Sequence, residues 1–328
     1  MTLSNIREVA LQAGVSPATV SRVVNGMDGF SEDTRLRVEQ AIADLNYQPD
    51  QFARGLRSPH AQLIGVLAPK VSDAFAFEIL EGVEASARDH GYAVMLGRTG
   101  LGSTFSQQYL RTMRAYRAAG IVLISAVITD ELRRTLGTTR PVISVAISDG
   151  SGTPSIAIDD RQAGFDGIQH LLRLGHRHIG VVAGDPRSVH VARPRLLGSE
   201  EALAKAGLEA ATVHGDFFYA SGADAVAQLL ARDPHVTAIF AHSDEMAVAV
   251  IHELQRRGFR VPEDISVLGF DNTATALKVH PQLSTVGQPL REMGTVAVAK
   301  LLRSRNLASR VMTHRIIQRA STAPPRNT

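Results

Sequence analysis

With 328 residues, 44% of them hydrophobic and 20% charged, the chain has the size and composition of a globular protein with two or three domains and a large core. It has no apolar run long enough to cross a bilayer, its polar residues 1–5 are unlike a signal peptide, and without cysteine it can form neither disulfides nor thiolate metal sites. Its net charge is only +3, and residues 1–58 hold six arginines against seven acidic side chains, so bulk charge does not predict a nucleic-acid partner.

Two short helices with a tight break between them are predicted near the amino terminus. Asn5 and Glu8 have the spacing of a capping pair at the start of the first helix. An apolar stripe follows at helical intervals, comprising Ile6, Val9, Ala10 and Ala13. Gly14 supplies the break, Ser16 caps the second helix, and Pro17 takes its first position, where a missing N–H costs nothing.

The second helix has one apolar face and one polar face. The apolar positions are Val20, Val23 and Val24, and the opposite face carries Ala18, Ser21, Arg22 and Asn25. Such a polar face suits a helix laid into a DNA major groove, where Arg22 can donate two hydrogen bonds to a guanine edge. A third helix is expected from Ser31, with the inward positions Val38, Ala41, Ile42 and Leu45. The pattern is typical of a helix-turn-helix module, and an ordinary three-helix packing unit is the alternative.

These residues resemble the LacI/GalR family of bacterial transcription regulators. The matching stretches are residues 6–10, 13–16, 19–26 and 45–49, and the resemblance continues to Ser321 and Thr322. It implies an all-α helix-turn-helix domain at 1–47, a hinge or linker at 48–61, and an effector-binding and dimerisation domain at 62–328. DNA contacts are then expected from seven residues of the second helix and its cap: Ser16, Pro17, Ala18, Thr19, Ser21, Arg22 and Asn25.

Residues 51–57 can form a short helix before Ser58 and Pro59. Seven residues of helix are unstable alone, and Gly55 weakens this one further by about 1 kcal/mol, so a flexible linker is one interpretation. The resemblance implies the other, a hinge helix that orders on DNA, with Ala53 and Leu56 in contact and the Leu56 side chains of two subunits wedged into the minor groove. The family commonly has serine or glutamine at the position of Gly55, so this hinge is expected to be less ordered.

From residue 63 onward, short apolar runs alternate with helical stretches. The expected strands are 63–67, 92–96, 121–124, 142–145, 179–183, 238–241 and 265–270, and the helices include 78–90, 161–174, 200–206, 223–230 and 246–257. This alternation predicts parallel sheets covered on both faces. The resemblance implies two doubly wound lobes of the periplasmic-binding-protein type, with chain crossings near Ile158, Gly287 and Arg319. Lobe 1 is then 62–159 with 289–319, and lobe 2 is 160–288 with 320–328.

Ligands of open parallel sheets bind beyond the carboxyl ends of the strands, and polar or aromatic side chains follow several of these ends. They are Asp73, Phe75, Arg193, Arg195, Asp216, Phe217, Ser243, Asp244, Asp271 and, at an expected crossing, Gln288. Two aromatic rings, an arginine fork and carboxylates can sandwich and hydrogen-bond a polyhydroxylated ring. The resemblance selects Arg195, Phe217 as the stacking aromatic, Ser243 at an amide position, Asp271 as the hydroxyl-binding carboxylate and Gln288. With Phe75, these are the expected effector residues.

The same region departs from the family at three positions. Val145 and Ala146 replace a pair resembling Asp-Arg, and Val191 stands where serine is frequent. A pocket without those polar groups is expected to bind a modified sugar, a polyol or a sugar acid rather than a common hexose.

Each candidate also has a purely structural interpretation. Asp271 can cap the turn at Asn272, Phe217 can belong to the core, and Arg195 can pair with a carboxylate on a neighbouring helix. His176 and His178 have the spacing of a metal pair, but the glycine before them favours a turn into a strand.

The expected function is a DNA-binding transcription regulator, usually a repressor in the family, whose affinity for double-stranded operator DNA is set by a small effector. A homodimer is expected because each recognition helix reads one half-site. We expect it in the cytoplasm, on the nucleoid when bound to DNA, without cofactor, metal or membrane partner. An enzyme is disfavoured because residues 100–105 break the dinucleotide fingerprint and no phosphate-cradling loop occurs. A transported-solute binder would need an export signal and would have no use for residues 1–58.

Overall fold

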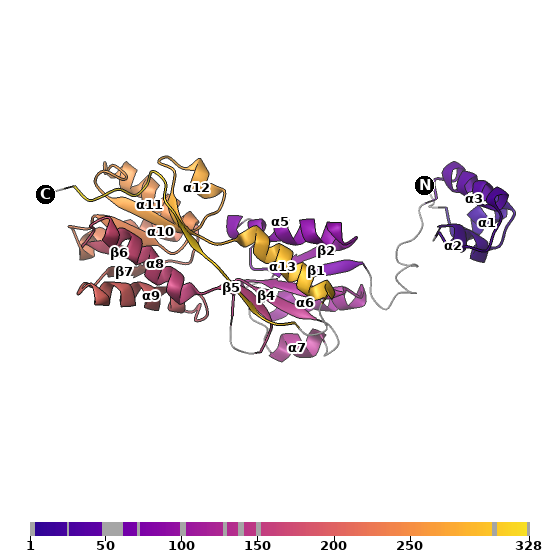
Figure 1. Cartoon of the computed structure of the whole chain (residues 1–328), viewed down its shortest axis with the longest axis horizontal. Helices are drawn as coiled ribbons and strands as arrows, with labels where there is room; N and C mark the ends of the chain where they lie inside the picture. Colours follow the sequence, from indigo (N-terminus) through magenta and orange to yellow (C-terminus); the bar gives the residue numbers. More distant parts are fainter. Residues whose placement is uncertain are drawn as a thin grey trace. The chain divides into compact units, whose positions relative to one another are not determined.

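The computed structural model describes residues 4–24, 26–47, 62–70, 73–98, 103–126, 130–136, 141–148, 152–303 and 307–326. The chain divides into two units, Met1–Ala61 and Gln62–Thr328 (Figure 1). No helix in the described ranges combines the length and the apolar character of a membrane span. Three of the expected DNA-contacting residues, Asn25, Ala53 and Leu56, lie outside the described residues.

The amino-terminal unit contains the helices α1 (Ile6–Ala13), α2 (Pro17–Val24) and α3 (Glu32–Asp44). Its core comprises Val9, Ala10, Ala13, Val20, Val38 and Ala41. The predicted capping box is confirmed, because Asn5 accepts the backbone N–H of Glu8 while the Glu8 carboxylate accepts that of Asn5, each at 3.2 Å. Gly14 makes the break with a φ of 65°, a conformation that costs glycine little. Ser31 caps α3 as expected.

Lobe 1 is built on a six-stranded sheet in the order β11-β5-β4-β3-β1-β2. Its strands are β1 (Leu63–Ala68), β2 (Ala93–Arg98), β3 (Gly120–Ile124), β4 (Val142–Val145), β5 (Ser155–Ile158) and β11 (Arg310–Met312). The helices are α5 (Ala74–Asp89), α6 (Ser103–Ala115), α7 (Asp130–Leu136) and α13 (Leu290–Arg303). Successive residues of β3 alternate between the faces, so that Val122 and Ile124 share a core cluster with α5 and α13 while Ile121 and Leu123 pack with α6.

Lobe 2 repeats this plan with a six-stranded sheet in the order β12-β10-β9-β8-β6-β7. Its strands are β6 (Ile179–Ala183), β7 (Ala211–His214), β8 (Ala238–Ala241), β9 (Ser266–Asp271), β10 (Ser284–Gly287) and β12 (Arg315–Ile317). The helices are α8 (Asp160–Arg173), α9 (Ala192–Lys205), α10 (Tyr219–Arg232), α11 (Asp244–Arg256) and α12 (Thr275–Lys278). The two parallel α/β lobes expected from the sequence are thus present.

The chain passes between the lobes three times, and the third crossing differs from the expected one. The first two lie between β5 and α8 and between β10 and α13, as expected. The third lies between β11 and β12, at Thr313 and His314, and not near Arg319. The reason is that β12 pairs antiparallel with β10, which assigns residues 315–317 to lobe 2. Strands of three residues are too short for a periodic pattern to place them.

Both lobes contain a pair of helices packed so closely that glycines line the contact. In lobe 1, a Cβ at Gly82 of α5 would lie 1.9 Å from the backbone oxygen of Arg291 in α13. In lobe 2, a Cβ at Gly198 of α9 would lie 1.8 Å from the backbone oxygen of Arg161 in α8. The α5–α13 and α8–α9 pairs lie side by side in Figure 1. Because the nearest atoms belong to the backbone of the neighbouring helix, no side-chain rotation can make room for an added Cβ.

Gly198→Ala should therefore lower the free energy of unfolding by about 1–3 kcal/mol, because α8 and α9 must move apart. Urea denaturation measures the change. Glu200→Ala, an exposed substitution on the same helix, should stay within about 0.5 kcal/mol of the wild type. A Gly198→Ala protein as stable as the Glu200→Ala control would show that the helices are not held at this contact.

Candidate functional site

The outer face of α2 is exposed and presents the residue types expected of a helix that reads DNA. Ser16 caps the helix by accepting the backbone N–H of Thr19 at 3.1 Å. Pro17, Ala18 and Arg22 are exposed, whereas Val20 on the opposite face is fully buried. Thr19 and Ser21 are half-buried. The structure thus places the described candidates on one surface of one helix.

The arginines of this unit differ in whether they are already paired. Arg35 forms ion pairs with Glu32 and with Glu39, and Arg37 pairs with Asp33 at 3.2 Å. The guanidinium groups of Arg22 and Arg7 have no hydrogen bond or ion pair in the described part of the unit. Arg22 therefore keeps its guanidinium available to an outside partner.

The second group of candidates meets at the carboxyl ends of the lobe 2 strands, with Arg195 at its centre. Arg195 is buried, and its Nε and Nη2 donate to Oδ1 of Asp160 at 3.1 and 2.6 Å. Its Nη1 donates to the backbone oxygen of His242 at 2.5 Å, and its guanidinium lies 3.4 Å from the ring centre of Phe270. The carboxylate pair considered as the structural interpretation of Arg195 is therefore present. Because a guanidinium has five N–H groups and three are used here, two remain for a ligand.

Ser243 and Phe217 are brought together by a hydrogen bond. Ser243 caps α11 by accepting the N–H of Met246 at 3.1 Å, and its hydroxyl donates to the backbone oxygen of Phe217 at 2.8 Å. The Phe217 ring lies against Gly184, where an added Cβ would approach it to 2.0 Å. Phe217 is half-buried, and its φ of 72° lies in the left-handed region, where a side chain other than that of glycine strains the backbone. The Ser243 hydroxyl thus contacts the backbone of Phe217 and not its ring.

Asp271 ends strand β9 as a buried carboxyl group with one hydrogen-bond donor among the described residues, the Gln288 amide at 2.8 Å. Burial raises the pKa of Asp271 well above its usual range, and the nearby Arg195 guanidinium only partly opposes this rise. Asp271 does not cap the following turn, because the N–H of Asn272 donates to the Thr285 hydroxyl at 3.3 Å. Asp271 and Gln288 are therefore a preformed pair at the strand ends.

Lobe 1 contributes residues close to this group of side chains. Asp73 caps α5 by accepting the N–H of Phe75 at 3.1 Å, and burial raises the pKa of Asp73 to about 6. The carboxylate of Glu245, at the start of α11 in lobe 2, adds to this rise. Lys70 lies 4.0 Å from the ring centre of Phe218 and joins the lobes directly. Phe75 is half-buried and packs against the core cluster that both lobes share.

The structure adds two residues that the sequence analysis did not select, Asp160 and His242. Asp160 directly follows the first crossing, and His242 directly follows β8, so strand-end position was the available signal for both. His242 is fully buried, and burial lowers its pKa well below the usual range. Its Nε2 lies 3.3 Å from the Ser199 hydroxyl, while its Nδ1 has no partner among the described residues.

Apolar residues occupy the positions where the family resemblance would supply polar groups. Ala146 is buried with a φ of 66° at the end of β4, and Val191 is the half-buried residue before α9. His176 and His178 bind different groups: His176 contacts Thr237 at 3.0 Å and a backbone oxygen, whereas His178 pairs with Asp233 at 3.1 Å. No cluster of possible metal ligands occurs in the described ranges.

Both units of the chain match families of known proteins. A model of bacterial regulatory proteins of the lacI family matches residues 5–50, and a periplasmic binding protein-like domain matches residues 168–322. The chain is 36% identical to catabolite control protein A of Priestia megaterium over 97% of this chain and 98% of that protein. It is 32% identical to the transcriptional repressor CytR of Escherichia coli K12 over 98% of this chain and 97% of that protein.

Solved structures agree over the full length. The lac repressor dimer bound to operator and the anti-inducer ONPF superposes with a TM-score of 0.87 and 29% identity, covering 98% of this chain and 100% of that chain. The complex of the transcriptional regulator CelR with cellobiose gives a TM-score of 0.73 and 29% identity, covering 97% and 99% of the two chains.

Proposed function

Since this chain is a member of the lacI family of bacterial regulatory proteins, and thus a transcription regulator rather than an enzyme, we propose that it binds operator DNA under the control of a small effector. The DNA-binding part of this proposal rests on the exposed Arg22 on α2, whose guanidinium has no ion pair within the described part of its unit. The division is proposed as DNA-binding unit 1–47, hinge 48–61 and effector domain from 62. In the hinge, Ala53 and Leu56 stay predicted DNA contacts.

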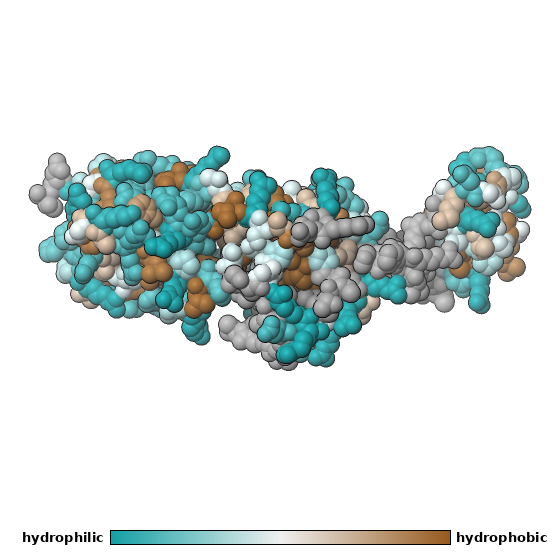
Figure 2. Space-filling model, turned by 60° about the horizontal axis from the view of Figure 1, so that its bottom comes forward, coloured by the Kyte–Doolittle hydropathy of each residue, from teal (hydrophilic) through white to brown (hydrophobic). Residues whose placement is uncertain are grey.

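The operator-bound form is proposed to be a homodimer. One α2 helix reads only one half-site, and a symmetric operator needs two. The related lac repressor structure is a dimer on operator. Helices α5 and α12 lie on the same side of the two lobes in Figure 1, and each exposes a large apolar side chain, Phe77 and Leu277. Figure 2 shows hydrophobic residues as small separate patches in a mainly hydrophilic surface. These side chains supply apolar area for a face between subunits.

The effector is proposed to be a neutral polyhydroxylated molecule, such as a polyol or a modified sugar. Asp160 already neutralises Arg195, and the remaining carboxyl groups of the cleft, Asp73 and Asp271, disfavour a second negative charge. This charge arrangement argues against a sugar acid. The apolar Ala146 and Val191 favour a ligand with fewer hydroxyl groups than a hexose. The related regulator CelR is solved in complex with cellobiose, a neutral disaccharide, which agrees with a neutral ligand class.

Control of DNA binding is proposed to follow from lobe closure. A ligand held by Arg195 and Asp271 of lobe 2 and reached by Asp73 and Lys70 of lobe 1 would stabilise one separation of the lobes. The hinges of a dimer would then be presented to DNA at a different spacing. Coupling of about 1–3 kcal/mol would change operator affinity by roughly 5–150-fold.

Arg22→Ala should weaken binding to the specific operator by about 1–3 kcal/mol while changing binding to random DNA much less. The reason is that a guanidinium in the major groove reads a base edge, whereas a phosphate contact is independent of sequence. Band shifts on both DNAs measure the two losses. Arg7→Ala removes an exposed arginine from α1 as the matched control, and it should reduce specific and random binding equally. Equal losses for Arg22→Ala would show that Arg22 contacts only phosphate.

A further inference from the structure

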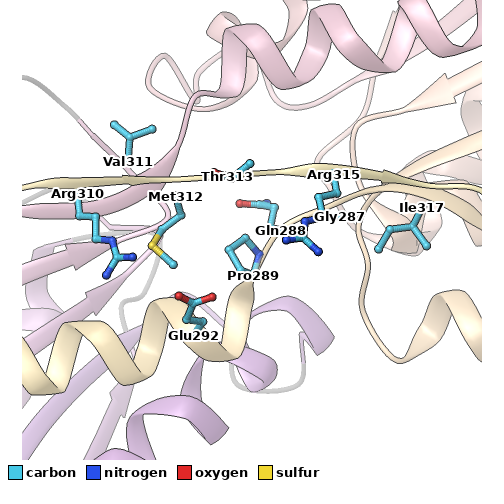
Figure 3. A pocket seen from close by; sticks show the side chains of 10 residues that line it. All are labelled: Gly287, Gln288, Pro289, Glu292, Arg310, Val311, Met312, Thr313, Arg315 and Ile317. Atoms are coloured by element: carbon cyan, nitrogen blue, oxygen red, sulfur yellow. The ribbon is translucent and has the colours of Figure 1, made fainter.

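A hollow whose lining includes neither Arg195 nor Phe217 lies at the place where the chain crosses between the lobes. It has a volume of about 420 Å³ and is lined by the end of β10, the first turn of α13 and the edge strands β11 and β12. We refer to it as the crossing pocket. Figure 3 shows Arg310 and Arg315 reaching it from its two ends, with the Glu292 carboxylate between them on the α13 side.

The charges of the crossing pocket are not satisfied within the described part of the protein. Arg310, Arg315 and Glu292 are exposed, and their side chains have no hydrogen bond or ion pair with any residue in the described ranges. Two guanidinium groups against one carboxylate leave an excess of one positive charge. The first-turn N–H groups of the 14-residue helix α13 add a partial positive charge at the same place.

The remaining lining is apolar. Met312 is buried, and Ile317 and Pro289 are half-buried beside it. A hollow of this volume accommodates a small organic molecule, and its lining combines an apolar floor with a cation at each end. Guanidinium groups bind carboxylates and phosphates through paired hydrogen bonds. We propose that the crossing pocket binds a small organic anion, an oxyanion carried on a compact apolar body, as a second ligand site of this regulator.

Such a ligand would contact both lobes at once. Arg310 belongs to β11 in the lobe 1 sheet, and Arg315 belongs to β12 in the lobe 2 sheet. An anion held by both guanidinium groups favours the lobe arrangement in which they point to one place. Gln288 lines the crossing pocket and also donates to Asp271 at 2.8 Å. Occupation of the pocket is thereby linked to the cleft; this link rests on the proposed role of Asp271, whereas anion binding itself does not.

The test uses the full-length protein without DNA and phenyl phosphate as the probe, with benzyl alcohol as its neutral counterpart. Isothermal calorimetry should show saturable binding of phenyl phosphate in about the millimolar range and weaker binding of benzyl alcohol. The double variant Arg310→Gln/Arg315→Gln should bind phenyl phosphate about tenfold or more weakly. Glu292→Gln should bind it more tightly, because a repelling charge is removed. Arg177→Gln, an exposed arginine outside the lining, should bind like the wild type.

Three outcomes would overturn the proposal. Equal affinity for phenyl phosphate and benzyl alcohol would show that the arginines are not used. Unchanged affinity in the double arginine variant would place the anion elsewhere. Loss of binding in Asp271→Asn with retention in the double variant would place it in the cleft. Because none of these measurements involves operator DNA, failure of the crossing pocket is distinguishable from failure of the proposed regulatory function.

Discussion

Asp160→Ala should lower the free energy of unfolding by about 3–5 kcal/mol, the largest stability effect we expect from a single side chain outside the apolar core. The substitution leaves the Arg195 guanidinium buried without its counterion, since the 2.6 Å pair is at most 9% exposed on either side. Burial raises the pKa of Asp160 and the Arg195 charge partly opposes this, so the pair depends on both partners being present. Urea denaturation at pH 7 measures the loss.

The double variant Asp160→Ala/Arg195→Met should recover most of that loss, because it removes both charges and leaves an apolar side chain of similar length. Glu201→Ala is the matched control. Glu201 pairs with Arg161 at 2.9 Å across the same two helices, but the pair is exposed and should be worth less than about 1 kcal/mol. A loss for Asp160→Ala no larger than that of Glu201→Ala would contradict a buried, unsolvated pair.

Asp271→Ala should abolish the response to effector while operator binding without effector persists. Each ligand hydroxyl left without its acceptor in this buried place costs about 1–3 kcal/mol, which is roughly 5–150-fold in affinity. Calorimetry against a panel of polyols and modified sugars, followed by band shifts with the best ligand, measures both properties. Asp224→Ala, an exposed aspartate on α10, should respond like the wild type.

A second variant protects this test against a folding defect. Asp271→Asn keeps an oxygen that can accept the Gln288 hydrogen bond, so it should fold normally and still respond more weakly. Effector binding by Asp271→Ala as tight as that of the wild type would place the effector pocket elsewhere.

Effector affinity should also depend on pH with a definite sign. Burial keeps the Asp271 pKa well above its usual range, raised further by Asp244 and Asp73 and lowered by Arg195. Hydroxyl groups that donate to both oxygens favour the ionised carboxylate, so binding releases a proton and affinity should rise with pH up to the pKa of the empty cleft. Affinity that falls with rising pH would show that the protonated carboxyl group donates to the ligand.

Local patterns in the sequence were sufficient for the elements whose signals are local. The capping box at Asn5 and Glu8, the break at Gly14 and the cap at Ser31 depend on residues within one helical turn. Strands such as β3 and β6 were predicted because each is a continuous run of buried residues, whereas β5, β7 and β10 were not among the expected strands. The predicted position of the third crossing was wrong because strands β11 and β12 have only three residues each. Their pairing with β5 and β10, which are distant in sequence, decides where they lie.

The candidate effector site likewise depends partly on local sequence signals and partly on long-range contacts. Strand-end position placed Arg195, Phe217, Ser243 and Asp271 among ten candidates, since parallel strands deliver their carboxyl ends to one edge, and the family resemblance then selected these four. Their partners depend on contacts between segments far apart in sequence: Asp160 meets Arg195 across 35 positions, and Gln288 meets Asp271 across 17. Composition and spacing therefore determined the helix-turn-helix pattern, the alternating α/β architecture and the residue types at the strand ends. Only the tertiary structure decided which of those charges are neutralised by the protein and which stay available to a ligand, because burial and long-range pairing set that balance.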